Sequence, residues 1–139
     1  MHRVSTFYHT SNQNPDMKTT TKETGDSAEH VARGYLLEKG YKILDTNWRI
    51  GHLELDIVAQ EGEELVIVEV KSKMGEGFEH PTDALSNKKI KKIITAAEAW
   101  IQFHNWTKET RFDLILVTIH GSNDFELEHY DNAFNPTAM

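Results

Sequence analysis

"HLELDIVAQEGEELVIVEVKSK", residues 52–73, is the stretch that decides the fold. Both of its halves are apolar and rich in β-branched residues, which predicts core strands at 52–60 and 64–73. Gly62 comes first in the two-residue link between them, and this order predicts a type II′ hairpin turn. Four charged residues nevertheless lie within the predicted core strands: Glu54, Asp56, Glu69 and Lys71.

The predicted hairpin pairing places these charged residues opposite one another. If positions 61 and 64 pair across the turn, Asp56 lies opposite Glu69, with Cβ atoms about 4.5–5.5 Å apart, and Glu54 lies opposite Lys71. Two carboxylates at this distance repel each other unless a divalent cation lies between them, and Mg²⁺ and Mn²⁺ prefer oxygen ligands. Lys71 could orient an attacking water or stabilise charge on a phosphate. The set predicts metal-assisted phosphodiester hydrolysis.

Structural explanations compete with this prediction. Glu54 and Lys71 could form a simple cross-strand ion pair. The same explanation is weaker for Asp56 and Glu69, because neither carboxylate gains an opposite charge from the other. His52 shares the predicted strand face with Glu54 and Asp56, so a His-x-Glu-x-Asp metal site is conceivable, although a position on the rim is the stronger interpretation.

The rest of the chain predicts helices on either side of these strands. Apolar residues recur at helical spacing from about 26 to 40, where Asp26 or Ser27 could cap the start and Gly40 suits the stop. A second helix is predicted from Asn87 to His104. Further strands are expected at 41–50 and 112–121, with an edge strand at 125–131, and a loop or short helical turn at 74–85. The resulting order, α-β-β-β-α-β, predicts an α/β fold with a mixed sheet flanked by helices.

Length and composition limit the functional classes. The 139 residues suit one domain at 26–139, and the polar residues 1–25 are expected to form a flexible arm in which Met17 is a second candidate start. The chain has no cysteine, which excludes disulfides and thiolate chemistry. No apolar run is long enough to span a bilayer, so we expect a cytoplasmic protein without a membrane partner.

Lysines gather after the two charged strands, although the net charge of the chain is -7. This acidity argues against a general nucleic-acid coat protein and requires any nucleic acid to meet a local basic patch. The cluster could equally be a solvated helix face. As a phosphate-binding patch, its candidate residues are Lys73, Lys88, Lys89 and Lys92, together with Lys91.

The series "GDSAEHVARGYLLEKGYKILDTNWR", "LELDIVA", "LVIVEVKSK", "HPTDALSNKK" and "RFDLILV" resembles the YraN family of uncharacterised bacterial proteins. That family has the restriction-endonuclease-like fold and is related to archaeal Holliday-junction resolvases. The resemblance spans residues 24–120 and implies an αβββαβ core with its active site on the second and third strands. Leu53 stands where the family usually has glycine.

The resemblance also implies roles for individual residues. It maps metal-binding carboxylates to Asp56 and Glu69, a metal-ligating carbonyl to Val70, and the catalytic lysine to Lys71. It maps a further acid to Glu29 on the first helix. Glu29 has a competing local role, because Asp-Ser-Ala-Glu at 26–29 has the spacing of a capping box.

Three functions follow from these observations. The first is a nuclease that uses Mg²⁺ or Mn²⁺ to cut DNA, with branched or recombination intermediates as candidate substrates and a homodimer as the expected assembly. The second is a non-catalytic nucleic-acid-binding module of the same fold that works with a repair partner. The third is a structural dimer in which the charges only stabilise the sheet.

Overall fold

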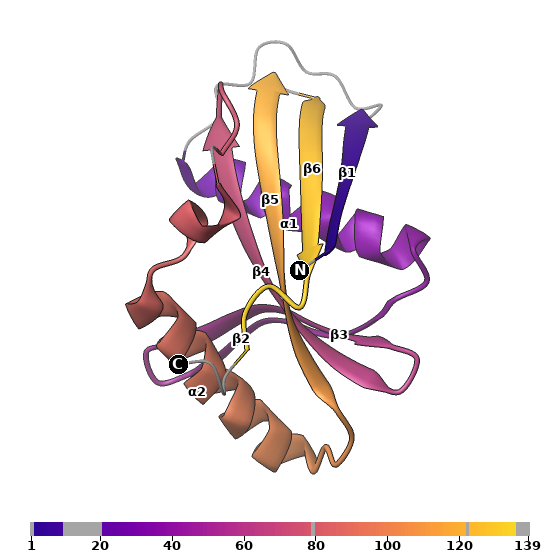
Figure 1. The fold of residues 1–139 in the computed structure, drawn as a ribbon, viewed down its shortest axis with the longest axis vertical. Helices are drawn as coiled ribbons and strands as arrows, with labels where there is room; N and C mark the ends of the chain where they lie inside the picture. Colours follow the sequence, from indigo (N-terminus) through magenta and orange to yellow (C-terminus); the bar gives the residue numbers. More distant parts are fainter. Residues whose placement is uncertain (1, 10–20, 79, 122, 136–139) are drawn as a thin grey trace.

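The computed structural model describes residues 2–9, 21–78, 80–121 and 123–135 (Figure 1). Within these residues, six strands form one sheet in the order β1-β6-β5-β4-β3-β2. The elements follow the chain as β1 (His2–His9), α1 (Thr21–Glu38), β2 (Lys42–Ile50), β3 (Leu53–Glu61), β4 (Glu64–Met74), the 3₁₀ turn η1 (Pro81–Ala84), α2 (Asn87–His104), β5 (Thr110–Gly121) and β6 (Asp124–Asp131).

The sheet is mixed, as predicted. β4 and β5 are parallel, whereas the other neighbouring strands are antiparallel. A parallel pair requires a long crossover connection, and α2 lies within the one that joins β4 to β5. The elements from α1 to β5 therefore have the restriction-endonuclease-like αβββαβ order expected from the resemblance.

The two helices cover opposite faces of the sheet (Figure 1). The buried side of α1, including Ala32 and Leu36, packs on one face with Ile115 and Val117 of β5. The buried side of α2, including Ile93, packs on the other face under the β3–β4 hairpin. Both helices therefore bring side chains to the central strands, one from each side.

The predicted hairpin register is confirmed from the turn as far as Ile57 and Val68, which lie opposite each other. Gly62 has a positive φ of 59°, whereas Glu63 has no positive φ. A type II′ turn requires this combination at its two central residues. The paired ladder between β3 and β4 ends at Ile57 and Val68, although both strands continue beyond it. This early end of the ladder positions the site described below.

The helix ends follow the sequence prediction at three of four places. α2 begins and ends where expected, and the Ser86 hydroxyl oxygen accepts a hydrogen bond from the Lys89 N–H at 3.1 Å. Gly40 follows α1 in the left-handed region, with a φ of 90°. The predicted start of α1 is wrong, because the helix begins at Thr21 and contains positions 26 and 27. The proposed capping box at 26–29 is therefore interior to the helix.

The N-terminal segment also differs from the expected flexible arm. Residues 2–9 form β1, which pairs along its whole length with β6, and residues 21–25 belong to α1. Valine, threonine and aromatic residues in 2–9 favour a strand, and the polar composition of the wider segment obscured this signal. β6, which we expected at an edge, consequently lies between β5 and β1. Residues 10–20, with the candidate start Met17, lie outside the described residues.

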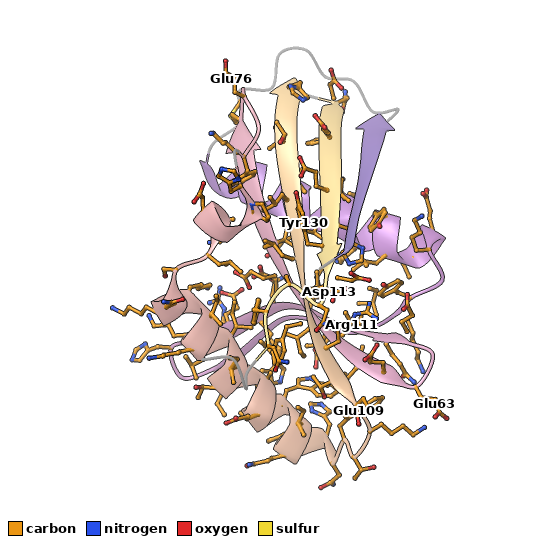
Figure 2. The ribbon with its side chains drawn as sticks, viewed as in Figure 1. Glu63, Glu76, Glu109, Arg111, Asp113 and Tyr130 are labelled. Atoms are coloured by element: carbon orange, nitrogen blue, oxygen red, sulfur yellow. The ribbon has the colours of Figure 1, made fainter. Side chains whose placement is uncertain are left out.

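A buried polar network joins β5 to its surroundings (Figure 2). Asp113 is fully buried, and its carboxylate accepts hydrogen bonds from Arg111 Nε at 2.8 Å, His129 Nε2 at 2.7 Å and the Asn132 N–H at 3.0 Å. Burial alone would raise the pKa of Asp113, but these three donors outweigh it and lower the pKa. His129 Nδ1 lies 2.9 Å from the Tyr35 hydroxyl, so the network links β5, β6 and α1.

Candidate metal centre between strands β3 and β4

The site lies where β3 and β4 separate. After the Ile57–Val68 pair, the side chain of Asp56 takes the place of a backbone acceptor, and its Oδ2 accepts the Val70 N–H at 2.9 Å. This bond fixes one carboxylate oxygen beside the β4 backbone. The alternation of β3 side chains between the two faces of the sheet also breaks here, since Leu55 and Val58 both pack with α2 whereas Ile57 packs with α1. The divergence gives Asp56 access to groups from both sides of the sheet.

Glu69 is the buried carboxylate of the site, with only 3% of its surface exposed. Burial and the neighbouring Asp56 raise the pKa of Glu69 to about 8, although Lys89 and Lys71 act against this shift. The Lys89 Nζ reaches Glu69 Oε1 from α2 at 3.6 Å. The two carboxylates thus repel each other in a water-poor setting, and the lysines relieve this repulsion only in part.

A second acidic grouping shares Asp56. Carboxylate oxygens of Glu29 from α1 and of Glu54 and Asp56 from β3 all lie within 4.8 Å of one another. The three side chains are half-buried. Asp56 therefore neighbours both this grouping and Glu69, at the point where β3 and β4 separate.

Asn47 holds two of these acids together. In the amide orientation that satisfies its neighbours, its side-chain nitrogen donates to Glu54 Oε1 at 3.2 Å and to Glu29 Oε2 at 3.0 Å. Asn47 lies within β2 in the left-handed region, with a φ of 49°, which is uncommon for a residue other than glycine. Sequence reasoning missed this residue, although an asparagine inside a predicted strand is itself a signal, because strands are depleted in asparagine.

The structure brings together most of the residues that the sequence singled out. Asp56 lies beside both Glu29 and Glu69, and the charge of Lys71 acts on Glu69. The predicted pairing of Glu54 with Lys71 is not observed. Among the described residues, Glu54 instead forms an ion pair with the exposed Arg49 at 3.7 Å, its neighbour across the β2–β3 hairpin, because β3 has already left β4 at this level.

The predicted lysine patch divides into two parts. Lys89 reaches the acidic centre, whereas its neighbours on α2, Lys88, Lys91 and Lys92, are exposed to solvent. Lys73 contacts the loop after β4, where its Nζ lies 3.4 Å from the Gly77 carbonyl and 5.9 Å from the centre of the Phe78 ring. His52 is exposed and does not belong to the acidic grouping found among the described residues.

The donor set fits a hard divalent cation. All candidate ligands are oxygens, from carboxylates and the Val70 carbonyl, which is the type of ligand that Mg²⁺ and Mn²⁺ prefer. Glu29, Glu54 and Asp56 place three carboxylates close together, and Asp56 also neighbours the buried Glu69. Burial, and next the charge of Asp56, raise the pKa of Glu69, and a cation bound there would favour the charged form of Glu69.

Element order and site together define an α/β protein with the restriction-endonuclease-like αβββαβ core and an acidic centre on β3 and β4. The chain belongs to the uncharacterised protein family UPF0102, whose model matches residues 28–117.

Relatives of the same family support this assignment. The UPF0102 protein of Bacteroides thetaiotaomicron is 44% identical over 114 residues, which cover 82% of this chain and 93% of the relative. Those of Nitratidesulfovibrio vulgaris and Parabacteroides distasonis are 42% and 38% identical; the matches cover 82% and 81% of this chain and 85% and 92% of the relatives.

Among solved structures, the chain is similar to Archaeoglobus fulgidus Hjc, a Holliday junction resolvase, at 15% identity and a TM-score of 0.47. This match covers 73% of the chain and 86% of that structure. None of the helices in the described part of the chain is long and apolar enough to cross a membrane.

Proposed function

We propose that this protein is a divalent-metal-dependent nuclease that hydrolyses DNA phosphodiesters. The observation that carries the proposal is the meeting of Asp56 and the buried Glu69 where β3 leaves β4, with Lys71 two residues further along the same strand. A purely structural role explains this arrangement poorly, because two adjacent carboxylates in a poorly solvated position destabilise the fold unless a proton or a cation joins them, and only a cation would do so with both groups charged.

Asp56, Glu69 and the Val70 carbonyl would hold the cation. Bound Mg²⁺ or Mn²⁺ supplies Lewis-acid stabilisation of a phosphate and makes a coordinated water more acidic. The hydrogen bond from the Val70 N–H fixes the Asp56 carboxylate in place, so that its other oxygen is oriented before any ligand arrives. Val70 thus serves the site through both of its backbone polar groups.

Lys71 and Glu29 complete the proposed chemistry. The Lys71 ammonium would orient the attacking water or stabilise charge on the phosphate, as a fixed cation beside the reacting atoms. Glu29 would accept a hydrogen bond from the water or assist with a second cation, and Asn47 positions it for this role. Lys88, Lys92 and Lys73 would contribute more distant phosphate contacts.

The metal site is tested by calorimetric titration of Mn²⁺ into the wild type and an Asp56→Asn/Glu69→Gln double variant. We expect binding to the wild type alone, with both proteins folded by circular dichroism. Cleavage is then tested on single-stranded, duplex and branched DNA of matched sequence, with Lys71→Met as the variant that keeps the carboxylates. Equal Mn²⁺ binding by both proteins would rule out a metal site at Asp56 and Glu69. Binding without cleavage of any substrate would rule out the nuclease and leave only a metal-binding protein.

Cutting both strands of a branched substrate would require two copies of this single site, and we therefore extend the proposal to a homodimer on such substrates. Sedimentation with and without a four-way junction tests this extension. A monomer that nicks one strand at a time would contradict the dimer without affecting the metal centre.

One observation favours the alternative of a nucleic-acid-binding module without catalysis. Lys89 lies 3.6 Å from Glu69 and already supplies one positive charge to the position that a cation would use. A Lys89→Met variant distinguishes the two functions. In a nuclease, loss of this competing charge should tighten Mn²⁺ binding, whereas in a binding module it should weaken DNA binding and leave Mn²⁺ binding absent.

A further inference from the structure

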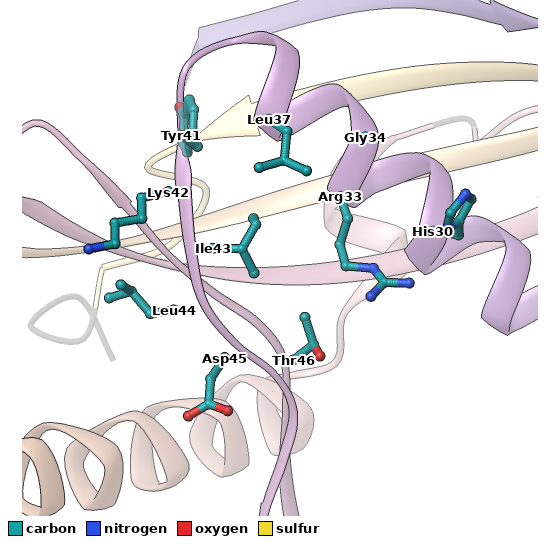
Figure 3. Close-up of a pocket in the computed structure, with 10 residues that line it drawn as sticks. All are labelled: His30, Arg33, Gly34, Leu37, Tyr41, Lys42, Ile43, Leu44, Asp45 and Thr46. Atoms are coloured by element: carbon teal, nitrogen blue, oxygen red, sulfur yellow. The ribbon is translucent and has the colours of Figure 1, made fainter.

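A groove runs between α1 and the edge strand β2, beside the acidic centre (Figure 3). It is an open cavity of about 920 Å³, and we call it the α1–β2 groove. Its lining includes Arg33, Gly34 and Leu37 of α1 and Lys42, Ile43 and Thr46 of β2. No described strand pairs with the outer side of β2, so this groove lies at the free margin of the sheet.

The groove is cationic although the chain is acidic. Arg33 and Lys42 contribute positive charge to its lining, and Asp45 is the one carboxylate among the described lining residues. Asp45 is already engaged, because it accepts a hydrogen bond from Trp100 Nε1 at 3.1 Å and lies 4.0 Å from His104 Nε2. Figure 3 shows its carboxylate turned toward α2. The groove therefore presents mainly positive charge to an incoming ligand.

Arg33 is available to bind a ligand. Its side chain is half-buried, and within the described part of the chain it has neither a hydrogen bond nor an ion pair. A guanidinium carries five N–H donors in a planar fork that matches the oxygens of a phosphate. In Figure 3, Arg33 extends from α1 toward the side where β2 presents the Thr46 hydroxyl. An anion with several acceptor oxygens would satisfy both groups.

The groove continues directly from the proposed metal centre. Glu29 and Arg33 are four residues apart on α1, which places them on the same side of the helix, about 6 Å apart along its axis. On the facing strand, Thr46 directly precedes Asn47, which bonds Glu29 and Glu54. A chain molecule held at the acidic centre would therefore meet Arg33 within about one helical turn.

We propose that the α1–β2 groove holds the nucleotides next to the bond being cut, as an unpaired strand with one phosphate on Arg33. This inference rests on the proposed nuclease function and names its substrate class: nucleic acid that is single-stranded beside the cut, as in a flap or an opened branch. The apolar side chains of Leu37 and Ile43 would contact a sugar or base. The cavity is of the size that encloses small ligands, about 300–1,000 Å³, rather than a duplex.

Gly34 offers a sharp test of this groove. A Cβ added there meets nothing within 4 Å, and Gly34 lines the groove, so a side chain that starts there has open space beside it. Gly34→Glu places a negative charge in the groove, and Gly34→Gln is the control with the same size and no charge. Binding of a fluorescent single-stranded oligonucleotide, a flap and a duplex of matched sequence is measured by anisotropy in EDTA, where no cutting occurs. Arg33→Gln is measured in parallel.

We expect Gly34→Glu and Arg33→Gln each to weaken binding of the single strand and the flap roughly tenfold, as loss of a charge-assisted phosphate contact does. Gly34→Gln should differ from the wild type by less than about threefold, and the Arg33→Gln slope of log K against log salt should fall by about one. Duplex binding should change little in any variant.

Three results would overturn the inference. Equal binding by Gly34→Glu and Gly34→Gln would exclude the groove as a phosphate site. Equal losses on duplex and single strand would exclude an unpaired occupant. A change in oligomeric state on sedimentation, with DNA binding unaltered, would instead assign the groove to contact with a second copy. In each case intact Mn²⁺ binding and cleavage would leave the nuclease proposal standing, whereas failure of the wild type to bind any nucleic acid would remove both.

Discussion

Replacing Glu69 by glutamine should stabilise the metal-free protein, although it removes a proposed metal ligand. Glutamine has the shape of a protonated glutamate and could likewise donate to the neighbouring Asp56. It cannot acquire the charge that is costly in this buried position. The gain in stability should therefore depend on pH, and its sign follows from the direction in which the pKa of Glu69 is shifted.

The magnitude follows from the shift itself. Folding raises the pKa of Glu69 from 4.5 to about 8, so that between these pH values the folded protein retains a proton that the unfolded chain has released. The free energy of unfolding of the wild type therefore decreases as pH rises through this window, by about 1.4 kcal/mol per unit for this group. Glu69→Gln should match the wild type near pH 4.5 and exceed it by roughly 3–5 kcal/mol above pH 8.

The assay is equilibrium urea unfolding in EDTA at several values between pH 4.5 and 9, followed by tryptophan fluorescence. The difference between the two free energies of unfolding isolates Glu69 from groups that titrate equally in both proteins. Lys89→Met provides the opposite control, because removal of the cation 3.6 Å from Glu69 should raise the pKa of Glu69 further and extend the decrease in stability to higher pH. Parallel curves for wild type and Glu69→Gln would refute the reasoning.

Three further outcomes are expected. Mn²⁺ should raise the Tm of the wild type more at pH 8 than at pH 6, because Glu69 must lose its proton to bind the ion, and Asp56→Asn should lose most of this shift. Asp113→Ala should lower the free energy of unfolding in urea by about 3–5 kcal/mol, because it leaves buried polar groups without their hydrogen-bond acceptor. Arg49→Ala removes an ion pair whose arginine side chain is 72% exposed, and it should lower the free energy of unfolding by less than about 1 kcal/mol. Gly34→Ala should raise the unfolding free energy by roughly 0.5–1 kcal/mol, and Gly40→Ala, at a φ of 90°, should lower it by about 1–2 kcal/mol; changes of the same sign would contradict the backbone argument.

The features that sequence reasoning predicted correctly are those that neighbouring residues determine. Gly62 fixes the turn, and the turn fixes the register that follows it as far as Ile57 and Val68. Ser86 and the apolar period of 3.6 residues fix the bounds of α2. The αβββαβ order follows from these local patterns because each element carries its own periodic signal.

The site was predicted less completely because its remaining contacts join distant elements. Alternation along ideal strands placed Glu54 opposite Lys71, but strand periodicity carries no information about where two paired strands separate. The contact of Lys89 with Glu69 depends on how α2 packs, and the role of Asn47 depends on α1 approaching β2. Asp56 and Glu69 were nevertheless identifiable, since charged residues within apolar strands violate the pattern around them.

The pairing of β1 with β6 has a consequence for synthesis of the chain. His2 lies opposite Asp131, so among the described strands the first along the chain pairs with the last. Contacts between such distant positions form slowly, because a long loop must close before any pairing is gained. The central strands and both helices can therefore assemble during translation, while β1 waits as an unpaired hydrogen-bonding edge. Completion of the sheet thus requires that β6 has been made, and until then β1 can pair with a neighbouring nascent chain.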